Sequence, residues 1–136
     1  MFTVRALNEN DYDKYLVEWW SKWPGWEAPP KDFLPENGRG GLMVEKEGIP
    51  IVAGFVYLTN SAIAWNEFII SNFDYKIKTD REDAILILIS ELCRVAKSCG
   101  KKYVYTVVKN KSLIEHYKKS GFISGSKTVD EMFIFL

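Results

Sequence analysis

The side chains best suited to move protons lie around residue 67 and between residues 110 and 122 of this chain. Tyr117 carries a phenol with an ordinary pKa of about 10, so it can hand a proton to a strongly basic leaving group. Glu67 supplies a carboxylate that becomes a better base if burial raises its pKa. His116 is the single histidine and the one side chain that titrates near neutrality unaided. These residue types together indicate general acid–base chemistry.

The residues around Tyr117 indicate which elements position it. An apolar run over 103–108 predicts a strand that leads into Asn110. A short helix is expected over 111–119, and Gly121 is typical of the residue that ends a helix in a left-handed conformation. The tyrosine is therefore expected on a short helix that directly follows a strand.

The rest of the chain indicates a small domain in which strands and helices alternate. We expect strands over 3–6, 42–46, 51–59, 63–70, 102–108, 122–124 and 131–136, and further helices over 11–22 and 80–99. Strands 42–46, 51–59 and 63–70 are close enough in sequence to form an antiparallel meander. The helix over 80–99 is dense in apolar side chains, so we expect it to pack centrally.

The segment from residue 24 to residue 41 is rich in chain breakers. It holds four of the five prolines and four of the nine glycines, which exclude a helix or a central strand. Loops of this length without regular structure are usually binding elements or mobile segments. The segment is therefore a candidate functional loop.

The composition favours one domain spanning residues 1–136. With 47% hydrophobic and 15% aromatic residues, the chain can bury most of its apolar surface in one core. Lysine plus arginine equals aspartate plus glutamate at 18 each, which removes the broad positive field that non-specific nucleic-acid binding requires. We therefore expect no nucleic-acid partner.

Hydropathy and cysteine usage indicate a cytoplasmic protein without a metal. The longest apolar run, 84–89, is far shorter than the roughly 20 residues of a spanning helix, and the N-terminus lacks a leader pattern. Cys93 and Cys99 are six residues apart on one predicted helix and point to different faces, so we expect both to be reduced and structural. No Cys/His cluster has the spacing of zinc ligands.

The spacing of Asn110, Tyr117, Gly121 and Phe122 resembles the closing motif of the GNAT (Gcn5-related N-acetyltransferase) superfamily. In that motif an Asn leaves the fifth strand, and a Tyr follows seven residues later, just ahead of a Gly-Phe pair. The order strand, helix, three strands, helix, strand, helix, strand is also the order of that family. The resemblance implies an α/β (α+β) GNAT fold, in which helices flank a mixed central sheet.

A narrower group within the superfamily is also similar to this chain. The segments that carry this likeness are Trp19-Trp20, Trp23-Pro24, Phe33-Leu34-Pro35, Thr59-Asn60-Ser61 and Ala64-Trp65-Asn66-Glu67. They resemble a GNAT-like group common in tailed bacteriophage genomes. That group supplies a fold and a host context, with the host cytoplasm as the expected location, and no substrate.

The superfamily resemblance implies acetyl transfer from acetyl-coenzyme A to a primary amine. Tyr117 would protonate the departing thiolate, and Glu67 would take the amine proton directly or through a water. For each residue a structural role stays open: Tyr117 as an aromatic packing inward, Glu67 as a solvated strand residue. Asn110 is expected either to hydrogen-bond backbone or cofactor amides at the strand end or to form a turn. His116 is expected on the surface.

The resemblance also implies where coenzyme A would bind. In the family the fourth and fifth strands splay apart, and the pantetheine arm bonds to main-chain groups of the fourth strand, here those of Phe68, Ile69 and Ile70. Strand alternation predicts that Glu67 faces away from Asn66 and Phe68. If the face with the glutamate lines the cleft, we expect the pKa of the Glu67 carboxyl to be raised.

The loop that receives the pyrophosphate in the family departs from the family pattern. Family members place glycines there, whereas 76–84 contains none. Thr79 and Glu82 have the spacing of a capping box that would occupy the same amides. The acids Asp80, Glu82 and Asp83 repel a diphosphate, while the cations Lys76, Lys78 and Arg81 would grip it from the side.

Two aromatic residues of the 24–41 segment are candidates for substrate binding. The tryptophans Trp19, Trp20 and Trp23 are explained as the apolar face of the first helix. Trp26 and Phe33 lie beyond it, where they would line the acceptor side of the cleft or anchor a protein partner.

Two functions of different classes follow from these observations. The first is an N-acetyltransferase that acts on a small-molecule or protein amine. The second is a non-catalytic GNAT-like phage protein that binds another protein and keeps a degenerate coenzyme A loop. A homodimer through the edge of the last strands or the tryptophan face is compatible with either.

Overall fold

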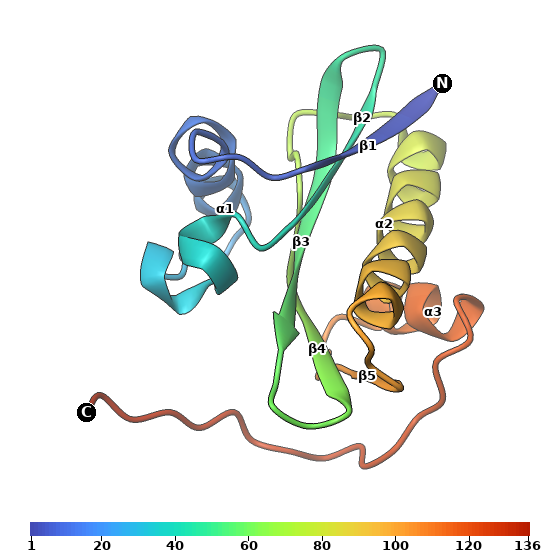
Figure 1. The fold of residues 1–136 in the computed structure, drawn as a ribbon. Coiled ribbons are helices and arrows are strands. Elements are labelled where there is room, and N and C mark those ends of the chain that lie inside the picture. The colour runs from blue at the N-terminus through green and yellow to red at the C-terminus, as the bar shows by residue number, and fades with distance from the viewer.

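The computed structural model describes residues 1–136 and contains one five-stranded sheet, whose strands lie side by side in chain order (Figure 1). The first four strands pair antiparallel, and the last pairs parallel with its neighbour. The strands are β1 (Phe2–Ala6), β2 (Gly41–Lys46), β3 (Ile49–Leu58), β4 (Ile63–Ser71) and β5 (Tyr103–Tyr105). This arrangement confirms the expected antiparallel meander and the mixed sheet that the resemblance implies.

Helices cover both faces of this sheet (Figure 1). The long helix α2 (Lys78–Ser98) lies on one face with α3 (Lys111–Lys119) beside it, and the π-helical turn η1 (Tyr12–Leu16) continues into α1 (Val17–Lys22) on the other. The proline- and glycine-rich segment forms two 3-10 turns, η2 (Lys31–Phe33) and η3 (Pro35–Gly38). None of these helices combines the length and the apolar composition needed to cross a bilayer.

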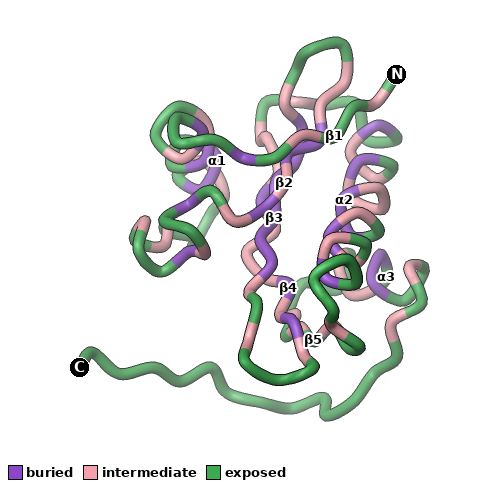
Figure 2. The backbone as a smooth tube through the Cα atoms, viewed as in Figure 1, coloured by how far each residue is buried: buried purple, intermediate pink, exposed green.

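Each face of the sheet has its own buried cluster (Figure 2). Towards α2, strand residues such as Val52 and Val56 pack against the helix residues Leu88 and Leu92. Gly54 has no side chain in this layer because a Cβ there would approach side-chain atoms of α2 to 3.1 Å. The central helix therefore packs closely on β3.

Towards α1, the core is built around two tryptophans. Trp19 and Trp20 are buried against Met43 and Phe55, as the helical spacing predicts. Trp23 is partly buried, and its indole N–H donates to the Ser71 carbonyl at 3.0 Å. The aromatic face of the first helix is thus structural.

A bulge in β4 changes which side chains share a face. The register runs from Ala53 opposite Ile70 to Phe55 opposite Glu67, so β4 has one more residue than β3 across this interval. Phe68 absorbs the extra residue with a φ of 58°. Its side chain therefore packs into the α1-side cluster, the same side that Glu67 faces. The expectation that Phe68 faces away from the glutamate is wrong because simple alternation stops at the bulge.

The start of α2 also differs from the expectation. The helix begins at Lys78, and no side chain caps its first amides, so the predicted capping box of Thr79 and Glu82 is wrong. Asp80 in the same turn has partners outside the helix, because its carboxylate accepts bonds from the Lys46 ammonium at 2.9 Å and the Tyr75 hydroxyl at 2.7 Å. These bonds hold the first turn against β2, while the first amides of α2 stay without a side-chain cap.

The two strands expected near 122–124 and 131–136 are absent, because residues 122–136 form no regular structure and are exposed almost throughout. The strand preference of apolar residues reflects packing on a half-buried surface rather than an intrinsic backbone state. No strand of the sheet lies against residues 122–136, so their apolar side chains have no half-buried sheet surface to pack on and no strand forms.

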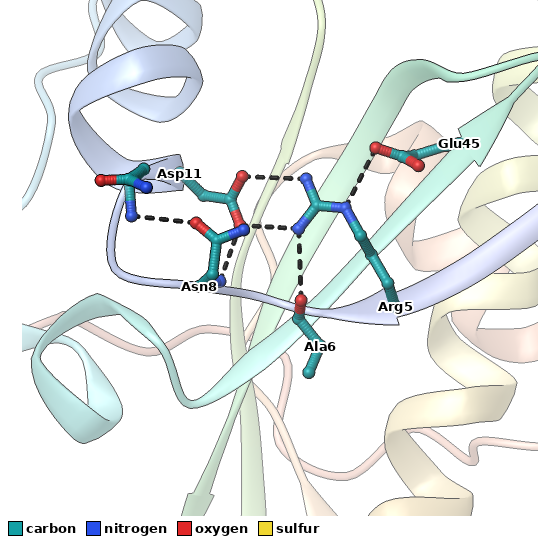
Figure 3. A network of polar contacts seen from close by, with 6 residues as sticks. Arg5, Ala6, Asn8, Asp11 and Glu45 are labelled. Atoms are coloured by element: carbon teal, nitrogen blue, oxygen red, sulfur yellow. Dashed lines mark hydrogen bonds and ion pairs between the residues drawn. The ribbon is translucent and has the colours of Figure 1, made fainter.

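A polar network attaches the first helical turn to the sheet (Figure 3). The buried Asp11 carboxylate accepts two bonds from the Arg5 guanidinium, at 2.8 and 2.9 Å, and one from the Asn8 amide at 2.7 Å. Arg5 also donates to Glu45 on β2 at 3.0 Å. Burial by itself raises the pKa of the Asp11 carboxyl, but the bonds from Arg5 and Asn8 outweigh it, so the pKa falls below its usual value.

We predict that Asp11→Ala lowers the free energy of unfolding by about 2 kcal/mol, because it leaves Arg5 and the Asn8 amide without their partner. Urea unfolding at pH 7 measures the loss. Since the folded-state pKa is depressed, the stabilisation is fully present above the unfolded value of 3.8 and is lost as the pH falls through the folded value. The difference between wild type and variant should therefore shrink at pH 3.

Asp13→Ala is the matched control, because that carboxylate is 75% exposed and forms one long ion pair with Lys31. Its effect should stay within about 0.5 kcal/mol. An Asp11→Ala effect of that size would remove the structural role of the network.

Candidate active site

The candidate site lies where β4 and β5 stop pairing. The parallel ladder runs from Ile63 opposite Tyr103 to Trp65 opposite Tyr105 and then ends. Strand β4 continues to Ser71, so its residues beyond Trp65 have no partner on the β5 side. The two strands therefore separate within the sheet, as the family resemblance implies.

Glu67 bridges the two strands at the point where they separate. Its Oε1 accepts a hydrogen bond from the Val107 amide at 2.9 Å, which replaces a bond that β4 would otherwise supply. The Thr106 hydroxyl donates to the Asn66 carbonyl at 2.5 Å and lies 3.3 Å from the same Oε1. The carboxylate is therefore held in place, with Oε2 making no hydrogen bond.

The surroundings of Glu67 favour its protonated form. Burial raises the pKa of its carboxyl above the usual value, and the Glu131 carboxylate acts in the same direction. The bonds from Val107 and Thr106 oppose this rise without cancelling it. A carboxylate with a raised pKa is the better proton acceptor near neutral pH, so the geometry suits a general base.

Tyr117 lies close to the same point, on the α2 side. Its side chain is buried, and its ring packs edge-on against Phe122 with centroids 4.8 Å apart. Burial raises the pKa of its phenol well above the usual value; the charges of Glu67 and Cys93 act in the same direction, and the Thr106 hydroxyl acts against it. The structure thus brings Glu67 and Tyr117 together around Thr106.

Thr106 and Asn66 are site residues that the sequence did not single out. Thr106 is the one aliphatic hydroxyl in the apolar run over 103–108, which is the signal available in the sequence. Asn66 is fully buried on the α2 side, opposite Val56, and its amide nitrogen and oxygen have no hydrogen-bond partner. A buried polar group without a partner costs about 1–3 kcal/mol. No feature of the sequence indicates that the Asn66 amide lacks hydrogen-bond partners.

Two polar residues near Tyr117, Asn110 of the motif and the neighbouring His116, have structural roles. Asn110 caps α3, since its side-chain oxygen accepts from the Leu113 amide at 3.0 Å. His116 is buried, and its Nδ1 lies 2.7 Å from the Ser112 carbonyl, so that nitrogen carries the proton. The expectation of a surface histidine is wrong because His116 shares the buried face of α3 with Tyr117, between Leu113 and Ser120 on the same stripe.

The three cations expected to hold phosphates surround the uncapped start of α2. Lys78 is 88% exposed and lies 3.9 Å from Glu82, the Lys76 ammonium lies 4.0 Å from the centre of the Phe73 ring, and Arg81 lies over Trp23. Asp80 is turned towards Lys46, and Glu82 is paired with a lysine. The predicted acidic repulsion is therefore weaker than the sequence indicates.

Of the two aromatic residues expected near the acceptor, one lies beside the site. Phe33 packs edge-on against Phe68 with centroids 5.7 Å apart. Trp26 is 52% exposed and forms no aromatic pair. A surface hollow of about 470 Å³ lies elsewhere, at the carboxyl end of α2 beside Cys93 and Tyr103. No three His, Cys, Asp or Glu side chains gather in a metal-binding arrangement.

The fold is similar to those of solved acetyltransferases. The ribosomal-protein-S18-alanine N-acetyltransferase from Escherichia coli matches with a TM-score of 0.71 and 16% identity, over 93% of this chain and 80% of that chain. The glucosamine-6-phosphate N-acetyltransferase from Arabidopsis thaliana matches with a TM-score of 0.63 and 15% identity, over 98% of this chain and 99% of that chain. AAC(6')-Iy in complex with the bisubstrate analog CoA-S-monomethyl-acetylneamine matches with a TM-score of 0.64 and 13% identity, over 98% and 99% of the two chains.

By sequence, no protein-family model and no curated protein matches this chain. At identities this low, the structural likeness defines the fold. The mixed sheet with flanking helices is the GNAT, acyl-CoA N-acyltransferase-like fold.

We predict that Glu67→Gln is at least as stable as wild type at pH 7, because the amide oxygen can still accept from Val107 and no charge is buried. For wild type, the raised folded-state pKa means that stability is full below the unfolded pKa of 4.5 and falls as the pH rises through the folded value. Urea unfolding between pH 4 and pH 8 should show this fall in wild type and not in Glu67→Gln. Glu115→Gln, an exposed change on α3, is the control and should follow wild type. A Glu67→Gln protein that is clearly less stable at pH 7 would contradict the burial argument.

Proposed function

We propose that this protein is an N-acetyltransferase that moves an acetyl group from acetyl-coenzyme A to a primary amine. The observation that carries the proposal is the placement of Glu67 and Tyr117 on either side of Thr106, where β4 and β5 separate. The names of the similar structures, all acetyltransferases, support it at the level of the reaction class. Several acceptor classes appear among those names, so they do not indicate which amine is used.

Glu67 acts as the base in the proposed reaction. The amine nitrogen attacks the thioester carbonyl, the new C–N bond forms, and the C–S bond breaks. The proton that leaves the nitrogen goes to Glu67, whose Oε2 makes no other hydrogen bond. Because Oε1 is held by the Val107 amide, the carboxylate need not reorganise to accept the proton.

Tyr117 acts on the departing sulfur. An ordinary thiol has a pKa of about 8.5, well below the raised pKa of this phenol, so complete proton transfer to the thiolate is uphill. The phenol therefore stabilises the developing thiolate as a hydrogen-bond donor, and the proton can finally come from solvent.

The chain offers groups that fit coenzyme A at three places. The unpaired edge of β4 around Phe68, Ile69 and Ile70 presents main-chain groups, as the resemblance implies for a pantetheine arm. The amide of Asn66 supplies a donor and an acceptor that lack partners in this chain. At the other end, the uncapped amides of α2 and the cations Lys76, Lys78 and Arg81 suit a diphosphate. When bound, acetyl-coenzyme A supplies the activated acetyl group.

A protein-binding module remains the second candidate. It is favoured by the glycine-free start of α2 and by the exposed aromatic rings of Trp26 and Phe33. The sequence also predicts a phage origin, a cytoplasmic location and a homodimer. These predictions are compatible with both candidate functions.

We predict that millimolar acetyl-coenzyme A raises the melting temperature, because a ligand of the native state stabilises it by linkage. Replacing both Lys76 and Lys78 by alanine should weaken binding about tenfold and reduce its dependence on salt. The matched control replaces Lys97 and Lys102, which lie at the other end of α2 and at the start of β5. Absence of any shift for wild type would exclude the transferase and favour the binding module.

We also predict that Tyr117→Phe keeps acetyl-coenzyme A affinity and lowers kcat about 100-fold, since only the hydroxyl is removed. Release of the free thiol under saturating substrates measures kcat, and the melting shift measures binding. Tyr103→Phe, whose side chain is 63% exposed, should leave both unchanged. Unchanged turnover in Tyr117→Phe would remove the phenol from the mechanism.

A further inference from the structure

Aromatic side chains cross the sheet beside Glu67 in one row. Tyr57 on β3 lies directly opposite Trp65 on β4, and Trp65 lies directly opposite Tyr105 on β5. The Trp65 and Tyr105 rings meet edge-on with centroids 4.4 Å apart. Direct cross-strand partners point to the same face. Since Glu67 lies two residues from Trp65, the carboxylate and the row share the α1 face of the sheet.

Two phenylalanines border the carboxylate on its other side. The bulge turns Phe68 onto the α1 face, where it lies 6.4 Å from Tyr57 and 5.7 Å from Phe33 between ring centroids. The Tyr57 hydroxyl donates to the Phe33 carbonyl at 2.8 Å, which fixes η2 against β3. We call Phe33, Tyr57, Trp65, Phe68 and Tyr105 the aromatic frame.

The frame is accessible and its centre is charged. Phe33 is 49% exposed and Tyr105 is 50% exposed, so a ligand can reach the rings from solvent. Glu67 lies opposite Phe55, two residues along β3 from Tyr57, so the carboxyl group is close to the frame. Burial and, to a smaller extent, the Glu67 charge raise the pKa of Tyr57 to about 12. A carboxylate among aromatic faces attracts a cation by its charge, and the ring quadrupoles add to the attraction.

The frame itself offers two neutral donors, the Trp65 indole N–H and the Tyr105 hydroxyl, and most other polar groups beside Glu67 are already bonded. The Tyr57 hydroxyl is bonded to Phe33, the Thr106 hydroxyl to Asn66, and one oxygen of Glu67 to Val107. Glu131 is the one other charged group that shifts the Glu67 pKa, and no cation does so. The several hydroxyl groups of a sugar would find only these two donors and one carboxylate oxygen, and a phosphate would meet the like charge of Glu67.

We propose that the acceptor of this site is a primary amine carried on a short arm by a flat aromatic body that bears no second charge. The inference rests on the proposed function and names its substrate class. The ammonium is drawn to Glu67, loses its proton to solvent, and attacks as the free amine; the aromatic body stacks on Phe33 and the neighbouring rings. The products are the N-acetyl amine and free coenzyme A, and Glu67 returns the proton it took from nitrogen to solvent.

The wild-type chain tests this with three amines of different chemistry: phenethylamine, spermidine and glucosamine 6-phosphate. Free thiol release gives kcat/KM for each, and the melting shift reports acetyl-coenzyme A binding separately. We expect phenethylamine to exceed the other two in kcat/KM by at least about tenfold, the factor that one or two aromatic contacts supply. A better rate with spermidine or glucosamine 6-phosphate, or no acetylation of any of the three with acetyl-coenzyme A bound, would overturn the inference and leave the proposed function standing. Failure of acetyl-coenzyme A itself to bind would overturn both.

A pair of variants tests the frame itself. Phe33→Ala should raise KM for phenethylamine about tenfold, while kcat and the KM for acetyl-coenzyme A change little, because Phe33 touches the body of the amine and not the reacting atoms. Ile49→Ala removes an apolar side chain of similar exposure at the far end of β3 and should change none of these constants. An unchanged KM for phenethylamine in Phe33→Ala would remove the frame from amine recognition. If Phe33→Ala fails to fold, the comparison of amines on wild type still decides the inference.

Discussion

The separation of β4 from β5 after Trp65 and Tyr105 is the constraint on which the site depends. When two paired strands part inside a protein, their facing amides and carbonyls lose partners and must find others. Val107 donates to the Glu67 carboxylate, and the Thr106 hydroxyl satisfies the Asn66 carbonyl. The Glu67 carboxylate, proposed as the base, therefore also takes the place of a main-chain acceptor for the Val107 amide. This hydrogen bond fixes its position as much as the packing of its side chain does.

This double role has an energetic consequence. Burial of Glu67 disfavours its charged form, and the isolated amide of Asn66 adds a further unfavourable term beside it. A stable fold alone would favour apolar residues at both positions. Two unfavourable polar groups in adjacent positions, at the point where the strands separate, are typical of a site in which stability is exchanged for binding or catalysis.

Much of the fold follows from sequence patterns, whereas the details of the site do not. The meander, the long central helix and the short helix carrying Tyr117 follow from apolar runs and from Gly and Pro at their ends. The bulge at Phe68 does not, because a positive φ at a phenylalanine has no local signal, and it decides which rings surround Glu67. At the first turn of α2 the capping box predicted from Thr79 and Glu82 does not form, and Asp80 is bound by Lys46 from a distant strand. Both departures involve contacts between segments far apart in the sequence, which local patterns do not encode.

The two faces of the sheet carry different halves of the proposed chemistry. Glu67 and the aromatic frame lie on the α1 face, while Asn66 and Tyr117 lie on the α2 side. At the opening between β4 and β5, groups from the two sides come close to each other around Thr106. In the proposed direct transfer the base acts on the attacking amine and the hydrogen-bond donor acts on the departing sulfur, so the two groups can lie on different sides of the reacting carbon. The separation of two strands in one sheet allows this arrangement without a second domain.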